Sequence, residues 1–167
     1  MSEETPATRR AARLAAVQSL YQMELTGTTA RQAITEFVRH RQGVPTAEEE
    51  GEIALEAADR ILYGAIVEGV KARGDDLDAM IGSALSSEWR VERLEVLLRA
   101  ILRAGTFELF ARPDTPAPII INDYVDVAHA FFAQREPGLV NAVLDRLARQ
   151  LRPDADEERR AGSSRAR

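Results

Sequence analysis

Apolar residues recur at intervals of three and four along nearly the whole chain, and β-branched residues seldom alternate with polar ones. Intervals of three and four place side chains on one face of an α-helix, whereas alternation would indicate a strand. Alanine is the commonest residue and aromatic residues make up only 5% of the chain, a composition that also favours helices. The sequence therefore predicts an all-α protein.

Glycine and proline divide this helical pattern into about seven segments, because both residues favour helix ends over helix interiors. We expect helices over about 8–25, 30–41, 48–71, 75–85, 90–110, 118–132 and 139–151. Gly74 would divide a single domain, 1–151, into an N-terminal lobe of about 8–74 and a C-terminal lobe of about 75–151. Residues 152–167 have no apolar period and are expected to form a disordered tail.

The apolar positions also predict which face of each helix is buried. In the first helix they are Leu14, Val17, Tyr21 and Leu25, and in the third they are Ile53, Ala57, Ile61 and Ala65. In the segment 90–110 they are Leu94, Leu97, Leu98, Ile101, Leu102, Gly105 and Leu109. In the last two helices they are Ile121, Val125, Ala128 and Phe132, and then Leu139, Val140, Val143, Leu144, Leu147 and Leu151.

The side chains that most enzymes and metal sites require are scarce. The chain has no Cys and two His, which argues against disulfides, thiol nucleophiles and most metal sites. His129 follows Asp126 at i+3, but such a pair is more often a surface ion pair than a catalytic one, and we expect Asp123 and Asp126 to be solvated. We predict no catalytic residue, no cofactor and no metal. The polar start and the lack of a long apolar run predict a cytoplasmic protein without a membrane segment.

The net charge of −5 opposes binding of nucleic acid by bulk charge. However, residues 48–80 contain ten acidic and three basic residues, a local charge of −7, which leaves +2 on the rest of the chain. The sequence thus predicts a polarised molecule. A low affinity for RNA in isolation, and dependence on a basic partner, would follow from this charge.

Two arginine groups are candidate RNA contacts. Arg9, Arg10 and Arg13 are neighbours on the first helix, opposite its predicted apolar face, and arginine binds phosphate bidentately and stacks on unpaired bases. The alternative is a solvated face, since the chain has 21 Arg in all. Trp89, with Arg90 and Arg93, could stack on a base; its alternative is packing in the core.

Four segments together resemble the NusB family of transcription antitermination factors. They are RRAARLAAVQSLYQMELTG at 9–27, VERLEVLLRAILRAGTFELF at 91–110, PIIINDYVDVAHAFF at 118–132 and LVNAVLDRLARQLRP at 139–153. The resemblance implies a two-lobed helical fold that binds the boxA element of ribosomal RNA leader transcripts. It also implies a heterodimer with ribosomal protein NusE, within a complex that keeps RNA polymerase elongating.

Several positions of this chain match the family's motifs. Arg9, Arg10 and Arg13 fall on its basic motif, Gln18 and Tyr21 on its AVQxLY segment, and Trp89 and Arg93 on aromatic and basic positions before the long C-terminal helix. Asn122 and Asn141 match family asparagines, which we assign to structure because Asn can cap a helix start. Gly138 and Leu139 replace a basic and an aromatic residue, Phe132 replaces a common Gly, and Leu98 stands where many relatives are acidic. Arg135 could restore a phosphate contact.

Two alternatives to an RNA-binding antitermination factor stay open at this point. The chain could be a helical protein-interaction module without direct RNA binding, its arginines merely solvated. It could also form a homodimer that covers the basic surface. An RNA cytosine methyltransferase, to which NusB-like domains are fused, would need a Cys nucleophile that the chain lacks.

Overall fold

The computed structural model describes residues 5–41 and 56–153, and within these residues the chain is helical with no strand. The seven described α-helices are α1 (Pro6–Thr26), α2 (Ala30–Arg41), α4 (Glu56–Ala72), α5 (Gly74–Ala84), α6 (Val96–Ala111), α7 (Ala117–Phe131) and α8 (Glu136–Leu151), and Val91–Arg93 form a single 3-10 turn. The prediction of an all-α fold is confirmed. The predicted helix start at 48–55 and the tail from 154 onward lie outside the described residues.

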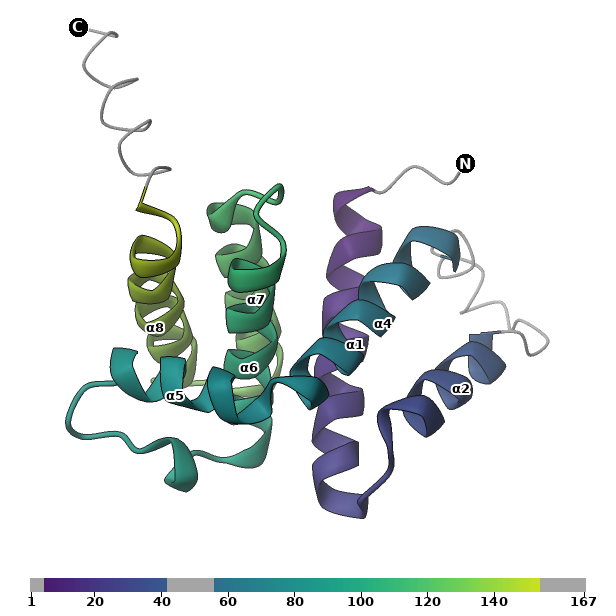
Figure 1. Cartoon of the computed structure of the whole chain (residues 1–167), viewed down its shortest axis with the longest axis horizontal. Helices are drawn as coiled ribbons and strands as arrows, with labels where there is room; N and C mark the ends of the chain where they lie inside the picture. Colours follow the sequence, from purple (N-terminus) through teal and green to yellow (C-terminus); the bar gives the residue numbers. More distant parts are fainter. Residues whose placement is uncertain (1–4, 42–55, 154–167) are drawn as a thin grey trace, which may run out of the picture.

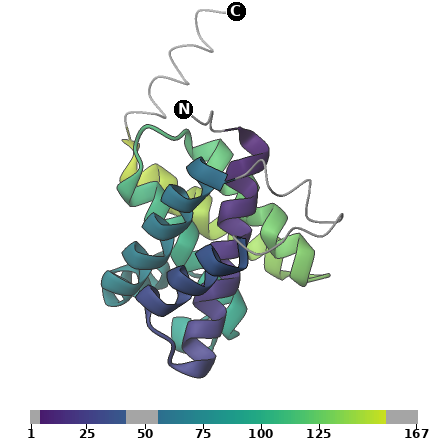
Figure 2. The same ribbon diagram turned by 90° about the vertical axis from the view of Figure 1, so that its right-hand side faces the viewer.

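The helices form two groups joined along α1 (Figure 1). α2 and α4 pack on one side of α1, as the turned view of Figure 2 also shows, while α6 and α7 contact its other side. α6 is the central element, because it contacts α1, α4, α5, α7 and α8. Whether these groups act as separate lobes divided at Gly74 stays a prediction.

The ends of α1 follow from its local sequence. Thr5 and Thr8 form a capping box, in which the Thr8 amide donates to Thr5 Oγ1 at 3.2 Å and the Thr5 amide donates to Thr8 Oγ1 at 2.9 Å. Pro6 occupies the first turn, where its missing amide hydrogen costs nothing. Gly27 ends the helix with φ 74°, a left-handed conformation that favours glycine.

The predicted buried faces are right for the C-terminal helices and wrong in part for α1 and α4. In α1 the buried apolar side chains are Ala12, Ala16, Val17, Leu20 and Met23, and in α4 they are Leu62, Tyr63, Ile66, Val67 and Val70. Ile61 is 75% exposed and Leu25 is also exposed. In α1 alanine supplies part of the buried face, and because alanine fits either a core or a surface, the larger residues predict the wrong positions. In α4 the buried positions Leu62 and Ile66 each lie one residue after the predicted Ile61 and Ala65.

Two predicted boundaries also shift. α6 begins at Val96 because residues 90–95 form the 3-10 turn and extended backbone, and α8 begins at Glu136 with Pro137 in its first turn. Arg152, predicted to open the disordered tail, is held in place. Its guanidinium donates to the backbone carbonyls of Glu108, Leu109, Arg112 and Thr115, and so satisfies carbonyl groups at the C-terminal end of α6.

A close approach of α4 to α6 depends on one glycine. A Cβ on Gly69 would lie 2.2 Å from ring atoms of Phe107, whereas a Cβ on Gly64, one and a half turns earlier, would meet nothing within 4 Å. We therefore expect Gly69→Ala to lower the free energy of unfolding by about 1–3 kcal/mol through overpacking. Gly64→Ala, the matched control, should raise it by about 0.5–1 kcal/mol. Urea denaturation measures both, and a stabilising Gly69→Ala would contradict the packing.

Candidate nucleic-acid interface

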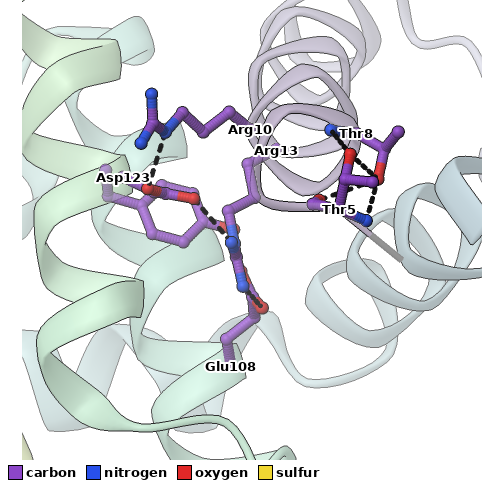
Figure 3. A network of polar contacts seen from close by, with 7 residues as sticks. Thr5, Thr8, Arg10, Arg13, Glu108 and Asp123 are labelled. Carbon is purple, nitrogen blue, oxygen red and sulfur yellow. Dashed lines mark hydrogen bonds and ion pairs between the residues drawn. The ribbon is translucent and has the colours of Figure 1, made fainter. Parts of the chain in front are cut away.

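Arg13 is the centre of a buried ion cluster rather than part of an exposed patch. Its side chain is 0% exposed, and its Nε and Nη2 donate to the two carboxylate oxygens of Glu108 on α6, each at 2.8 Å. Its Nη1 donates to Asp123 Oδ2 on α7 at 2.6 Å (Figure 3). Tyr124 completes the cluster by donating its hydroxyl hydrogen to Glu108 Oε2 at 2.6 Å. The prediction of three exposed guanidiniums is therefore wrong for Arg13.

The buried cluster shifts the protonation of its members. Burial lowers the pKa of the Arg13 guanidinium, but the hydrogen bonds and negative charge of Glu108, with those of Asp123, outweigh burial and raise the pKa above its ordinary value. Burial, followed by the negative charge of Glu108, raises the pKa of the Tyr124 hydroxyl well above its ordinary value. Arg13 is therefore held charged and Tyr124 neutral at physiological pH.

Arg10 lies at the edge of the same cluster. Its side chain is 61% exposed, and its Nε lies 3.4 Å from Asp123 Oδ1, on the carboxylate whose other oxygen accepts from Arg13 (Figure 3). The structure thus brings together Arg10 and Arg13 on Asp123, but leaves only Arg10 of the two at the surface. Arg9, on the same turn of α1, is partly buried. Asp123, predicted to be solvated, is instead buried between the two arginines.

The second predicted group is gathered at the connections that precede α6 and α8. The Arg135 guanidinium stacks over the Trp89 ring at 5.1 Å from its centroid, a cation–π contact. Trp89 is partly buried against the core, so the packing alternative holds for part of its surface. Arg90 is exposed and lines a groove of about 560 Å³ with Trp89. Arg93 and Arg135 are exposed as well.

The two arginine groups do not form one site. The N-terminal turns of α1 lie at one end of the molecule, and the connection between α5 and α6 lies at the other (Figure 1). Gln18 is exposed and lines a separate groove of about 330 Å³ between α1 and α2, while Tyr21 is partly buried. Asn122 and Asn141 are exposed inside α7 and α8, so neither caps a helix start as predicted.

Glu108 and Tyr124, which complete the buried cluster, had no role in the sequence predictions. A signal existed for Glu108, since it is an acidic residue inside the apolar segment Phe107 to Phe110, where a charge requires a buried partner.

A second network joins α1, α5 and α6. Arg103 is bidentate on Asp78 at 2.7 Å for each bond, and Glu24 is paired with Arg99 and Arg103.

Within the described part of the chain, no helix combines the length and apolar character needed to cross a membrane. The described residues also contain no group of three or more His, Cys, Asp or Glu placed to hold a metal ion.

The buried cluster predicts different roles in stability for two neighbouring arginines. Arg13→Ala should lower the free energy of unfolding by about 3–5 kcal/mol, because it leaves the carboxylates of Glu108 and Asp123 without their buried cation. Arg10→Ala, which removes the exposed partner of the same carboxylate, should change it by about 0–1 kcal/mol. Urea denaturation of both variants checks the assignment. Equal losses would contradict a buried role that is specific to Arg13.

Tyr124 predicts a loss of stability at alkaline pH. The pKa of its hydroxyl is raised in the folded state, so above pH about 10 the folded chain keeps this proton while the unfolded chain releases it. The contribution of this group to the free energy of unfolding is therefore fully present below pH about 10 and declines above it. The decline reaches at most about 1.4 kcal/mol per pH unit for one group. Tyr124→Phe should flatten the fall in unfolding free energy above pH 10. Tyr63, whose pKa is also raised by burial, contributes equally to both proteins, and parallel curves would refute the prediction.

Comparisons with known proteins support the family resemblance of the sequence motifs. The family model for the NusB family matches residues 10–149. The transcription antitermination protein NusB of Sinorhizobium fredii (strain NBRC 101917 / NGR234) is 52% identical over 144 residues, 86% of this chain and 88% of its own length. That of Maricaulis maris (strain MCS10) is 46% identical over 153 residues, 92% and 93% of the two chains.

Solved structures give the same result for the fold. A crystal form of T. maritima NusB has a TM-score of 0.66 at 25% identity, over 95% of this chain and 99% of that one. A crystal structure of the antitermination factors NusB and NusE in complex with double-stranded RNA has a TM-score of 0.69 at 21% identity, over 86% and 98% of the two chains. The family match, the close relatives and the shared fold together show that this chain belongs to the NusB family.

Proposed function

We propose that this chain is an RNA-binding transcription antitermination factor. In this proposal it binds the boxA element of ribosomal RNA leader transcripts together with ribosomal protein NusE, and acts within the complex that keeps RNA polymerase elongating in the cytoplasm. Its relatives at about 50% identity are transcription antitermination proteins, and a fold neighbour is bound to NusE and RNA. The chain would act by binding, without a catalytic step.

The exposed guanidinium of Arg10 is the observation that carries the RNA-binding role. It lies at the start of α1 beside Arg9, on the family's basic motif, and 61% of its side chain is exposed. An exposed arginine at a helix start can approach a phosphate without any rearrangement of the core. Arg13, on the same motif, supports this surface from the inside instead of contacting RNA.

The second group supplies a different kind of contact. Trp89 presents an aromatic ring with Arg135 stacked on it, and Arg90 and Arg93 are exposed nearby in sequence. Such a group suits unpaired bases and their phosphates. We propose it as an additional contact for RNA, and Gln18 and Tyr21, which lie further along α1, as weaker candidates.

A helical protein-interaction module without direct RNA binding is the second candidate. The paired state of many arginines favours it, since Arg13, Arg99, Arg103 and Arg152 are all engaged within the chain. This alternative predicts that NusE is captured after RNase treatment and that no RNA footprint appears at Arg9 and Arg10. A homodimer would be detected by light scattering with and without NusE.

Binding of a labelled boxA RNA, compared with a scrambled RNA, tests the proposed function. Arg10→Ala should weaken boxA binding and reduce the steepness of the log–log salt dependence by about 0.7, the contribution of one phosphate contact on a single strand. Arg149→Ala is the matched control, because Arg149 is an equally exposed helical arginine paired with Asp145 at i, i+4 on α8. Fluorescence anisotropy titrations at several salt concentrations, with and without NusE, measure both quantities.

The outcomes of this titration separate the two candidates. Preference for boxA over the scrambled RNA, with a loss confined to Arg10→Ala, supports the antitermination factor. Unchanged affinity and salt dependence in Arg10→Ala would refute the assigned surface. If, in addition, RNA is not bound in the presence of NusE, the interaction module becomes the better description.

A further inference from the structure

The carboxylate of Asp123 is held in a fixed orientation by buried partners. Asp123 lies on α7 with 9% of its side chain exposed, and its Oδ2 accepts from Arg13 Nη1 at 2.6 Å. Arg13 cannot move freely, because Glu108 binds its other two donor nitrogens at 2.8 Å each, and Tyr124 in turn donates to Glu108 at 2.6 Å. The remaining oxygen, Oδ1, therefore has a defined position at the rim of the core.

That oxygen approaches the one arginine of this cluster that is largely in solvent. Arg10 Nε lies 3.4 Å from Asp123 Oδ1, and Arg10 precedes Arg13 by three residues, so both side chains reach α7 from the same face of α1. A contact through Nε leaves the terminal Nη1 and Nη2 as the fork with which a guanidinium can bind a phosphate.

The charges of the cluster explain why Arg10 is drawn to this position. The buried part contains one cation, Arg13, and two carboxylates, Glu108 and Asp123, which amounts to one excess negative charge with Tyr124 neutral. Arg10 supplies the compensating positive charge at the surface. Because Asp123 is largely shielded from water, this pair is screened less than an ordinary surface ion pair.

We propose that Asp123 is a positioning residue for Arg10, which orders the Arg10 guanidinium before RNA binds. The inference rests on the proposed RNA-binding role of Arg10 and adds a cause for its geometry. A free arginine side chain loses rotamer freedom when it binds a phosphate, and an arginine already held at its Nε loses less. The buried cluster thus contributes to RNA affinity although its members do not touch RNA.

A double-mutant cycle between Arg10→Ala and Asp123→Asn tests this coupling, with labelled boxA RNA as the probe and thermal melting to verify folding. Asparagine retains an acceptor for Arg13 but removes the charge that holds Arg10. Asp123→Asn should weaken RNA binding about three- to tenfold when Arg10 is present, the effect of ordering one side chain. In the Arg10→Ala background it should change binding by less than about twofold.

Each other result overturns the inference. Equal weakening in both backgrounds would mean that Asp123 acts only through the general structure. Tighter binding by Asp123→Asn would mean that its carboxylate competes with RNA for Arg10. An Arg10→Ala variant that binds as well as the parent would instead refute the RNA-binding role of Arg10, and a parent chain without preference for boxA RNA would refute the proposed function. Either result removes the basis of the inference.

Arg10→Lys tests the same positioning without a change at Asp123, so it does not depend on whether Asp123→Asn folds. Lysine keeps the positive charge, but has neither the Nε that meets Asp123 nor the planar fork. We expect a loss of about three- to tenfold in affinity with an unchanged salt dependence, since the same charge meets the same phosphate. Binding equal to that of the parent chain would show that an ordered guanidinium is not required.

Discussion

The buried ion cluster around Arg13 is the interaction on which the arrangement of the helices depends. It joins α1 to α6 and α7 through Glu108 and Asp123, residues separated by 95 and 110 positions from Arg13 in the chain. A buried charge is tolerated only where its partners satisfy it in good geometry. The hydrogen bonds to all three donor nitrogens of Arg13 therefore specify the register and rotation of α1 against the C-terminal helices more strictly than apolar packing alone.

The same cluster separates the two arginines of one motif by function. Both arginines contact Asp123, but Arg13 is buried, where its charge is matched by carboxylates, whereas Arg10 lies at the rim of the core and is largely exposed. The pairing in the core thus decides which arginine is available at the surface, and the fold and the proposed site share a single physical cause.

The fold was largely predictable from the sequence because helices depend on local periodicity and on helix-end residues. The prediction succeeded best for α8, where leucine and valine define one face clearly. It failed in part for α1, where alanine supplies part of the buried face, and for α4, where apolar residues stand at adjacent positions and periodicity does not single out the buried ones. The sequence predicts an exposed patch for Arg13 and a disordered tail for Arg152, because their partners lie far away in the chain, at Glu108 and Asp123 and on backbone carbonyls at and after the end of α6. The placement of charged side chains depends on such tertiary partners, which spacing along one helix does not reveal.

Charge pairing inside the fold also changes what the abundance of arginine means. The chain has 21 Arg, yet Arg13, Arg99, Arg103 and Arg152 are engaged by carboxylates or backbone carbonyls of the chain itself. An arginine whose side chain is turned into the fold in this way cannot approach a phosphate, so it adds no phosphate contact. The number of phosphates that the chain can neutralise is therefore smaller than its arginine count. With a net charge of −5 opposing approach to RNA, tight binding requires either ordered individual contacts, such as Arg10 on Asp123, or additional positive charge from a partner.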